Sequence, residues 1–289
     1  MSAPLLVVDG PCLLYRSFFA LPDSIRGLDE HPVNALLGAT NALLRIAADR
    51  RPRAVVMCFG AEAAAYRVEL YSGYHAARPP VPDDLAWQFE QAPGYFAGFG
   101  WSSMDRDTLE ADDLLGSLAR VESEAGGQTL IATGDRDMYQ CATEQVHVLY
   151  LKSGATGFQA VGPAEVRRRY GVAPELVPDF IALRGDPSDG LPGAPGIGAK
   201  TAADLLSRHG SLEGAIAKAV GERPRVTAAL RENAQELRAF REIALLRIVE
   251  VQRPADAPTD LEGGATAARG LGLRRLAERL EQANSLTDL

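Results

Sequence analysis

The stretch "QTLIATGDRDMYQ" (128–140) joins a short apolar run to two closely spaced carboxylates. The run lacks polar alternation, which is typical of a strand buried on both faces of a mostly parallel sheet. Runs of the same kind occur at 5–9, 54–59 and 146–150. Helical patterns separate these runs, at about 33–50, 83–98 and 110–125. Strand alternating with helix predicts an α/β domain in which helices flank a mostly parallel sheet.

Acidic residues gather where the predicted strands end. In an open α/β sheet, ligands bind in the crevice beyond the carboxyl ends of the strands, so we expect acids from separate segments to meet there. The acids concerned are Asp9, Asp135 and Asp137 behind two of the strands, and Glu110, Asp112 and Asp113 at the start of a helical pattern.

The acids at the helix start also have an ordinary explanation. Negative side chains suit the positive end of a helix, and Asp107 with Glu110 has the spacing of a capping box. A single Asp behind a strand is commonly a helix cap. Several carboxylates at one place, however, raise one another's pKa, and a divalent cation removes this repulsion. Because all the candidate ligands are oxygen donors, they favour Mg²⁺ or Mn²⁺ and two-metal hydrolysis of phosphodiesters.

The stretch "LRGDPSDGLPGAPGIGAKTAADLL" (183–206) adds two acids, Asp186 and Asp189, to a cluster of glycines. Its end resembles a nucleotide-binding P-loop, but Ala199 separates the last glycine from Lys200 and no apolar strand precedes it, which excludes that motif. We interpret the stretch as a glycine-rich hairpin between two helices, whose free N–H groups bind phosphate. An ordinary turn of Gly and Pro is the alternative.

The segment "AEAAAYRVELYSGYHAARPPVP" (61–82) mixes tyrosines with cationic side chains and ends in prolines. One interpretation is a surface helix whose aromatic rings pack inward. The other is a mobile element that presents cations and ring faces to a phosphate chain, because Arg binds phosphate while bases stack on Tyr. The residues of the segment favour neither interpretation.

Composition narrows the class of protein. Hydrophobic residues make up 46% of the 289 residues and charged residues 24%, which is typical of a soluble globular protein, and no apolar run is long enough to span a membrane. We expect the apolar N-terminus to be a strand rather than a signal peptide. The scattered Cys12, Cys58 and Cys141 form no CxxC pair, which indicates a reducing cytoplasm and argues against a zinc site and a disulfide framework.

The net charge of −8 is unusual for a protein that binds nucleic acid. The eight acids named above as candidate ligands carry a charge equal to this total, so the rest of the chain sums to about zero. A neutral body with local basic patches binds DNA through phosphate contacts, and we expect that binding to be weak and sensitive to salt.

The texture of the sequence changes near residue 163. The α/β domain is predicted to span 1–162, and short helical patterns separated by Pro and Gly predict a smaller helical domain over 163–251. This second domain is expected to end in a strand at 245–251. In the remainder, 252–289, we expect a loose linker up to residue 270 and a final amphipathic helix near 271–284 that packs on the body.

Several motifs follow one another in an order that is informative as a set. They are Asp9 with "LLYRSFFAL" (13–21), "YRVELYSGYHAARP" (66–79), "LEADDLLGSLA" (109–119), "TGDRDMYQ" (133–140) and "LRGDPSDGLPGAPGIGAKTA" (183–202). Together they resemble the bacterial 5′–3′ exonuclease and flap endonuclease family, which includes the 5′-nuclease domain of DNA polymerase I. The resemblance covers roughly residues 4–250, and because no polymerase domain follows we expect a stand-alone nuclease.

The resemblance implies a PIN-like α/β domain, a helical arch at about 61–95, a helix–hairpin–helix variant, and Mg²⁺ or Mn²⁺ as cofactor. It implies that the first metal is held by Asp9, Glu110 and Asp112, with Asp113 alongside. It implies that the second metal is held by Asp135, Asp137, Asp186 and Asp189.

The resemblance also implies which residues meet DNA. The cations that meet the scissile phosphate are expected to be Arg67 and Arg78, together with His75. Two residues match positions near the cleavage site, Tyr15 and Arg16. The hairpin that holds duplex backbone, commonly through a bound K⁺, is matched by Gly193, Gly196, Ile197 and Gly198, followed by Lys200 and Thr201.

The chain departs from the family pattern at two positions. Family members usually follow the second strand with Asp, whereas "MCFGAEAAAYR" (57–67) has Gly60 in that place, so one first-metal carboxylate is missing. The arch usually carries Lys where this chain has His75, which is only partly charged near neutral pH and gives weaker, pH-dependent phosphate stabilisation. We expect an active nuclease, weaker than its relatives or shifted toward Mn²⁺, with Gly60→Asp increasing its Mg²⁺-dependent activity.

The function expected from sequence is that of a 5′ flap endonuclease and 5′–3′ exonuclease in DNA replication or repair. The alternative is a catalytically weakened or inactive protein of the same fold that binds DNA junctions, and a PIN-type ribonuclease is a third possibility that the hairpin disfavours. The expected partner is branched or 5′-flap DNA, with DNA polymerase and ligase acting beside a monomeric, cytoplasmic, nucleoid-associated enzyme that does not contact membranes.

Overall fold

The computed structural model describes residues 3–151, 157–283 and 285–288, and the helices and strands given below belong to that part of the chain. A six-stranded sheet forms the centre, in the order β3-β2-β1-β4-β5-β6. All neighbouring strands are parallel except β6, which is antiparallel to β5. The strands are β1 (Leu5–Asp9), β2 (Ala54–Cys58), β3 (Ser102–Met104), β4 (Thr129–Thr133), β5 (Val146–Leu151) and β6 (Phe158–Val161). The predicted α/β class with a mostly parallel sheet is confirmed.

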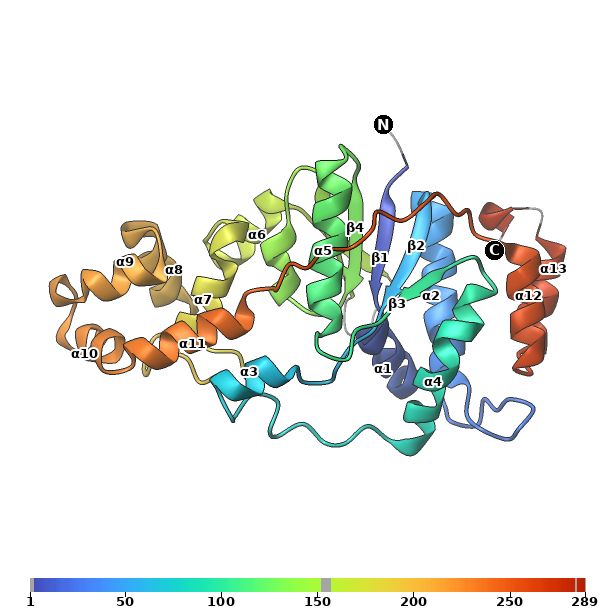
Figure 1. The fold of residues 1–289 in the computed structure, drawn as a ribbon, viewed down its shortest axis with the longest axis horizontal. Coiled ribbons are helices and arrows are strands. Elements are labelled where there is room, and N and C mark those ends of the chain that lie inside the picture. The colour runs from blue at the N-terminus through green and yellow to red at the C-terminus, as the bar shows by residue number, and fades with distance from the viewer. Residues whose placement is uncertain (1–2, 152–156, 284, 289) are drawn as a thin grey trace.

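Helices cover both faces of the sheet and extend beyond one of its edges. Those of the α/β part are α1 (Gly10–Ala20), α2 (Asn34–Arg50), α3 (Ala65–Leu70), α4 (Asp83–Ala97) and α5 (Ala111–Glu124). The following helices are α6 (Pro163–Tyr170), α7 (Val177–Arg184), α8 (Ala199–His209), α9 (Leu212–Ala217), α10 (Pro224–Glu232) and α11 (Ala234–Ala244). The last two are α12 (Leu261–Gly270) and α13 (Arg274–Gln282). Figure 1 shows α6 to α11 at one end of an elongated molecule and α12 and α13 at the other.

The central strand β1 is buried along its whole length, as its unbroken apolar sequence predicts. Its side chains alternate between two cores: Leu5 and Val7 face the core shared with α5, α7 and α11, whereas Leu6 and Val8 face the core shared with α1, α2 and α4. The two short strands that the sequence did not indicate, β3 and β6, lie at the edges of the sheet, where fewer side chains are buried.

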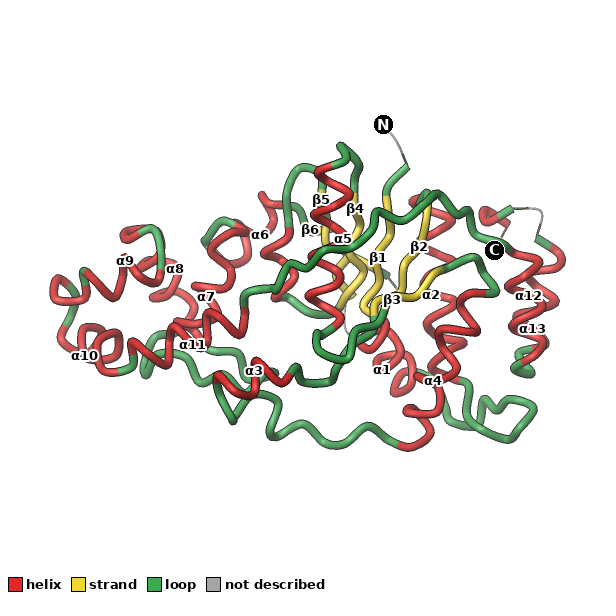
Figure 2. The backbone as a smooth tube through the Cα atoms, in the orientation of Figure 1, coloured by secondary structure: helices red, strands yellow, loops and turns green. Residues whose placement is uncertain are grey.

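The segment between α11 and α12 is extended, and we call residues 245–260 the strap (Figure 2). The prediction of a strand at 245–251 is wrong, because the strap pairs with no other strand. Its amides are bound by side chains instead: the N–H of Arg247 donates to Asp113 Oδ1 at 2.9 Å and that of Val249 to Ser117 Oγ at 3.0 Å. The apolar residues that suggested a strand pack against α5, with Leu246 buried.

The loose linker predicted up to residue 270 is also wrong, because α12 begins at Leu261. Its sequence, "LEGGATAARG", has two adjacent glycines, which disfavour a helix by propensity. Tertiary packing overrides that propensity: a Cβ on Gly264 would lie 2.4 Å from Phe99 Cδ1, so only glycine lets the helix approach that ring. The helix predicted near 271–284 corresponds to α13, whose Leu276 and Leu280 are buried against the body.

The strap is fastened to the α/β part by a buried cluster of charges. Glu122, with 1% of its surface exposed, accepts hydrogen bonds from the guanidinium groups of both Arg53 and Arg253. Arg53 also donates to the carbonyl oxygen of Pro254 at 2.7 Å. We call Glu122, Arg53 and Arg253 the clasp.

None of the described helices has the length and apolar character needed to cross a membrane.

Candidate active site

The carboxyl edge of the sheet brings together acids from separate segments. Asp9 ends β1, Asp135 lies two residues beyond β4, and Asp137 begins the short 3₁₀ helix that follows. Asp112 comes from the first turn of α5, which packs against β1 and β4. The sequence therefore predicted correctly that these segments meet at one edge, because parallel strands end on the same side of a sheet.

Hydrogen bonds fix the orientation of these acids. Asp9 accepts from the backbone N–H of Cys12 at 2.9 Å and from the hydroxyl of Thr133 at 2.6 Å, so it caps α1 and reaches β4 at once. The same Thr133 oxygen accepts from the N–H of Asp135 at 2.9 Å, and Asp135 accepts from the N–H of Asp137 at 2.8 Å. Thr133 thus links two strands at the site, a role that its place inside an apolar run did not reveal.

The acids are close enough to repel one another. Burial first, and then the charge of Asp135 and Asp9, raise the pKa of Asp112 well above its ordinary value. Burial and the charges of Asp189, Asp9 and Asp186 raise the pKa of Asp135 to about 7. The pKa values of Asp137 and Asp9 are raised too, chiefly by burial, and for Asp137 also by its acidic neighbours. A group of carboxylates with raised pKa values is a place where positive charge is missing.

The donor set fits a divalent cation in its chemistry. It contains only carboxylate and hydroxyl oxygens, which hard cations prefer, and the repulsion described above would be relieved by such an ion. Within the described residues, no three acidic, His or Cys side chains lie close enough to form a ready-made cage.

Glu110 and Asp113 are engaged differently from the other acids. Asp113 is fully buried and accepts from both terminal nitrogens of Arg67, at 2.8 and 3.2 Å. Glu110 lies 3.1 Å from the same guanidinium and also accepts from the hydroxyl of Tyr74 at 2.8 Å. The structure gives Asp113 the role of a buried structural partner, so the expectation that it lies alongside the first metal does not fit its position.

Arg67 itself is 2% exposed. Besides the two acids, its Nε donates to the carbonyl oxygen of Ile243 at 2.9 Å, which ties α3 to α11. A guanidinium with all of its sides occupied in this way has no surface left for a scissile phosphate. The role expected for Arg67 therefore does not fit this structure, and the family motif alone did not reveal the difference.

The segment between α3 and α4 touches the hairpin region at one place. The Nε2 atom of His75 lies 3.2 Å from Asp189 Oδ1, and an Nη2–Oδ1 distance of 3.0 Å joins Arg78 to the same carboxylate. His75 adopts a φ of +54° and stacks on the ring of Tyr74. Asp186 is held locally, by the N–H of Ser188 at 2.9 Å and by Arg184 at 2.9 Å. Of these groups, Arg78 is the most exposed cation near the acids, with 39% of its side chain exposed.

The expected arch at about 61–95 contains one short helix, α3, an irregular stretch over 71–82, and α4 (Figure 1). Near the sheet edge, Arg16 donates to the carbonyl oxygen of Leu151 at 2.9 Å, and the ring of Tyr15 lies 5.1 Å from that of Phe19. Both residues are partly exposed and belong to α1, the helix that begins directly after Asp9.

The glycine-rich stretch forms the predicted hairpin between α7 and α8. Gly193 and Gly196 have φ values of +68° and +76°, which explains the choice of glycine at both. Ile197 is 4% exposed and anchors the hairpin in the core. Gly198 precedes α8 and has open space around it, while Lys200 is exposed and Thr201 half-buried in the first turn.

Gly60 follows β2, where an acid was expected from the family pattern. A Cβ at this position would lie 2.4 Å from the carbonyl oxygen of Leu109 and 2.9 Å from the carbonyl carbon of Glu110. These are backbone atoms of the segment that leads into α5, so they cannot turn aside as a flexible side chain would. The site is therefore built around the absence of a side chain, and Gly60→Asp would not simply restore a ligand.

Family comparisons cover most of the chain. Residues 4–171 match the family "5′-3′ exonuclease, N-terminal resolvase-like domain", and residues 172–262 match "5′-3′ exonuclease, C-terminal SAM fold". The chain is 36% identical over 281 residues to a 5′-3′ exonuclease of Mycobacterium tuberculosis, covering 90% of this chain and 87% of that protein. It is 35% identical over 254 residues to DNA polymerase I of the same species, of which it spans 28%.

Solved structures with this fold include a T5 5′-exonuclease and the catalytic core of Rad2. T5 5′-exonuclease with bound zinc ions has a TM-score of 0.69 at 16% identity, covering 96% of this chain and 98% of that one. The catalytic core of Rad2 in complex with DNA substrate has a TM-score of 0.64 at 12% identity, covering 97% and 92%. At these identities the similarity shows the fold alone.

Proposed function

Because the chain belongs to the 5′–3′ exonuclease family, we propose that it is a structure-specific 5′-nuclease that hydrolyses DNA phosphodiesters at the carboxyl edge of its sheet. The observation that carries the proposal is the group of buried and half-buried acids from three segments, Asp9, Asp112, Asp135 and Asp137, whose pKa values are all raised. Such a group is suited to holding divalent cations, and perturbed carboxylates of this kind are concentrated at active sites.

The same four acids are the residues that we propose to hold the cations, Mg²⁺ or Mn²⁺, with Asp186 and Asp189 beside them. When bound, two such ions supply an activated water and stabilise the leaving oxygen of a phosphodiester. Thr133 and the N–H of Cys12 orient Asp9 for this role. Glu110 also remains a candidate, although it must share its oxygens with Arg67 and Tyr74.

The substrate is proposed to be branched or 5′-flap DNA. The hairpin at Gly193–Gly198 and the exposed Lys200 are suited to duplex backbone, because free N–H groups and a cation bind phosphate without reading sequence. Arg78, which is partly exposed beside Asp189, is the arch cation that can reach a phosphate without leaving a buried position. The single-stranded DNA between arch and sheet would pass close to Tyr15 and Arg16.

The setting of the reaction follows from the same family. DNA polymerase I relatives join a related domain to a polymerase, which supports a role beside DNA synthesis, with a ligase sealing the product. We infer a monomer, because the acids of the proposed site all come from one chain. The described cysteines are all free, which suits the reducing cytoplasm where the chromosome lies.

The test compares cleavage of a labelled 5′-flap DNA in Mg²⁺, Mn²⁺ and EDTA. Wild-type protein should cut the flap with either ion and not in EDTA, while Asp135→Asn should lose at least about 100-fold in rate, since one cation ligand is removed. Glu124→Gln, at the exposed end of α5, is the matched control and should cut normally. A wild-type protein that binds the flap but cuts in neither ion would establish the non-catalytic alternative.

That alternative, a weakened or inactive junction-binding protein, has specific observations in its favour. Backbone atoms leave no room for a side chain at Gly60, so no ligand can be supplied there. Glu110 and Asp189 are both paired with cationic side chains of the same protein. Single-stranded RNA in the same assay separates the ribonuclease alternative, which predicts cleavage of RNA and not of flap DNA.

A further inference from the structure

One of the exposed glycines of the hairpin, Gly196, lies beside a cationic side chain. Gly193 and Ile197 turn into the protein, where the N–H of Ala194 donates to the carbonyl oxygen of Leu183 at 2.9 Å and Ile197 is buried. Gly196, with its φ of +76°, remains exposed at the tip.

A guanidinium group from a distant helix packs on this glycine. A Cβ added to Gly196 would lie 3.0 Å from Nε of Arg225, 3.2 Å from its Nη2 and 3.3 Å from its Cζ. Arg225 comes from the first turn of α10, almost thirty residues further along the chain. Gly196 therefore serves two purposes, since it provides the left-handed turn and makes room for the Arg225 side chain.

Arg225 has no acidic partner in the part of the chain that the structure describes, a feature that it shares with Arg231 of the same helix but not with several other arginines nearby. Three other arginines of the helical region are each paired with acids: Arg208 with Glu222, Arg238 with Glu213, and Arg241 with Asp179. The first turn of α10 contains no acid either, so Arg225 sits unneutralised at the positive end of a helix. A cation there is unfavourable for the helix itself, so the helix gains nothing from it.

We propose that Arg225 binds a backbone phosphate of duplex DNA at the hairpin and supplies positive charge there from the protein's own chain. The inference rests on the proposed function, because it assumes that the hairpin meets DNA. The Arg225 guanidinium already lies beside the hairpin and is exposed to solvent, so it can meet a phosphate there without leaving a buried position. Such a contact carries no sequence information and fixes the position of the duplex.

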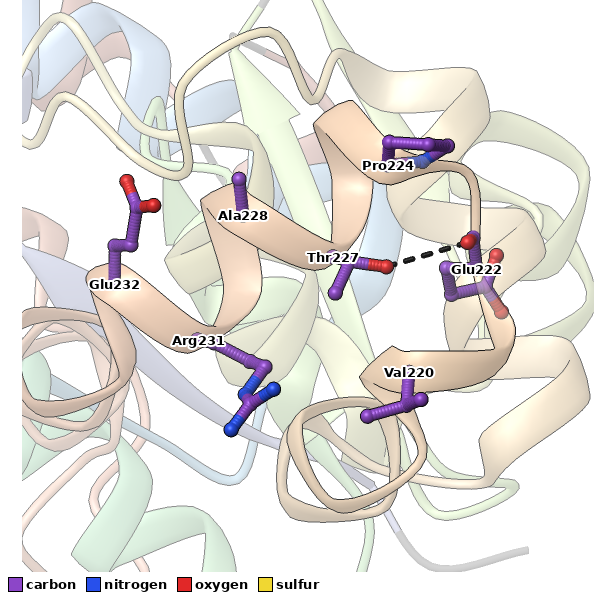
Figure 3. A pocket seen from close by; sticks show the side chains of 7 residues that line it. All are labelled: Val220, Glu222, Pro224, Thr227, Ala228, Arg231 and Glu232. Carbon is purple, nitrogen blue, oxygen red and sulfur yellow. Dashed lines mark hydrogen bonds between the residues drawn. The ribbon is translucent and has the colours of Figure 1, made fainter.

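The helix α10 offers a matched control. Arg231 lies six residues after Arg225, which places it about 120° away around the helix. It lines an open depression with Val220 and Thr227 (Figure 3), and no residue of the hairpin at 193–198 lines that depression. Arg231 is also exposed and without an acidic partner in the described structure, so Arg231→Ala removes the same charge from the same helix.

The experiment measures binding of the full-length protein to 5′-flap DNA in Ca²⁺, without cleavage, from 50 to 300 mM salt. Arg225→Ala should weaken binding roughly tenfold at the lowest salt and reduce the slope of log K against log salt by about 1, as expected for one lost phosphate contact. Arg225→Lys should keep the slope and lose part of the affinity. Arg231→Ala should match wild type in both, and thermal unfolding should confirm that all variants are folded.

A second readout separates binding from chemistry. In single-turnover cleavage at saturating enzyme, Arg225→Ala should cut at the wild-type rate, because the residue lies on the hairpin and not at the acids. Equal affinity and equal slope for wild type and Arg225→Ala would overturn the inference. A second result would also overturn it: wild-type binding that weakens when Na⁺ replaces K⁺ at constant ionic strength, with Arg225→Ala binding as tightly as wild type. The cation at the hairpin would then come from solvent and not from Arg225. A wild type that binds no flap DNA would instead sink the proposed function.

Discussion

At the scale of single residues, Gly60 decides how the metal edge is built. Its Cα faces the backbone of Leu109 and Glu110, and a Cβ would lie 2.4 Å from the nearest oxygen, which is closer than real Cβ atoms approach. The segment that leads into α5 therefore lies nearer to β2 than it would beside any larger residue. The missing carboxylate is part of the packing and not a simple gap.

Gly60→Ala is expected to destabilise the fold by about 1–3 kcal/mol, because the backbone of two segments must separate. Gly60→Asp should destabilise it at least as much and should not increase Mg²⁺-dependent cleavage. Gly94→Ala is the matched control: no atom lies within 4 Å of its Cβ position, and Ala is favoured in a helix by up to about 1 kcal/mol. Chemical denaturation of the three variants measures the effect, and a stable, more active Gly60→Asp would contradict it.

The raised pKa of Asp135, about 7 against an ordinary 3.8, makes stability depend on pH. Between these two pH values the folded protein holds more protons than the unfolded chain, so the free energy of unfolding falls as pH rises. In EDTA, the melting temperature of the wild type should therefore decrease from pH 5 to pH 8. Asp135→Asn should show a smaller decrease. At pH 8 its melting temperature should exceed that of wild type by roughly 2–4 °C for each kcal/mol of stability that the variant recovers.

Thermal unfolding at several pH values measures this difference. Glu124→Gln, which removes an exposed carboxylate from α5, should keep the wild-type slope. Parallel curves for wild type and Asp135→Asn would show that burial and neighbouring acids do not perturb this carboxyl as described.

At the scale of elements, a buried ion pair sets the position of α3. Arg67 on α3 binds Asp113 on α5 and a carbonyl oxygen at the end of α11, so a single side chain joins three helices. The Oδ1 atom of Asp113 also accepts a hydrogen bond from the backbone N–H of Arg247, which places the strap beside α5. Tyr66 completes the cluster by donating to Asp113 at 3.1 Å.

Arg67→Met should destabilise the protein by about 3–5 kcal/mol, because it leaves the buried Asp113 carboxylate without its cation. The control is Arg120→Ala on α5, the helix that carries Asp113. This change breaks an exposed i,i+4 pair with Glu124 and should alter stability by at most about 1 kcal/mol. Urea denaturation compares the two. Similar, small effects would mean that Arg67 is not needed to compensate the charge of Asp113.

At the scale of the whole molecule, the strap crosses from the helical end to α12 and α13 at the other end (Figure 1). The clasp holds it midway, since Glu122 binds an arginine of the body and an arginine of the strap. Beyond the clasp, the N–H of Ala257 donates to the carbonyl oxygen of Arg53 at 2.8 Å, and Trp101 Nε1 donates to Thr259 at 3.0 Å. The last helices are therefore coupled to the sheet through the strap as well as through their own core.

Glu122→Gln should destabilise the protein by about 3 kcal/mol, because the buried Arg53 loses most of its compensating charge. The strap should then become a site of limited proteolysis between residues 250 and 260, with fragments identified by mass spectrometry. Asp256→Asn, which removes an exposed partner of Arg53, should leave both stability and the cleavage pattern nearly unchanged. Equal resistance of Glu122→Gln and wild type would contradict this role of the clasp.

Much of the fold and of the proposed site was predictable from local patterns. Short apolar runs indicated β1, β2, β4 and β5, and helical periodicity indicated α2, α4 and α5 with nearly correct bounds. Parallel strands end at one edge, so the acids behind them were expected to meet, and the charges of Asp9 and Asp135 do raise the pKa of Asp112, as that of Asp135 raises the pKa of Asp137. Positive φ values at Gly193 and Gly196 likewise follow from glycine in a tight hairpin.

Only the tertiary structure decided which charges are free and which are paired. The contacts Arg67–Asp113, Glu122–Arg253 and Arg225–Gly196 join residues far apart in sequence, and no local period relates them. The strap had the composition of a strand, but its N–H groups found side-chain acceptors on α5 instead of a neighbouring strand. Short-range patterns determine elements because they depend on backbone geometry, whereas the partner of a buried charge depends on which elements pack against it.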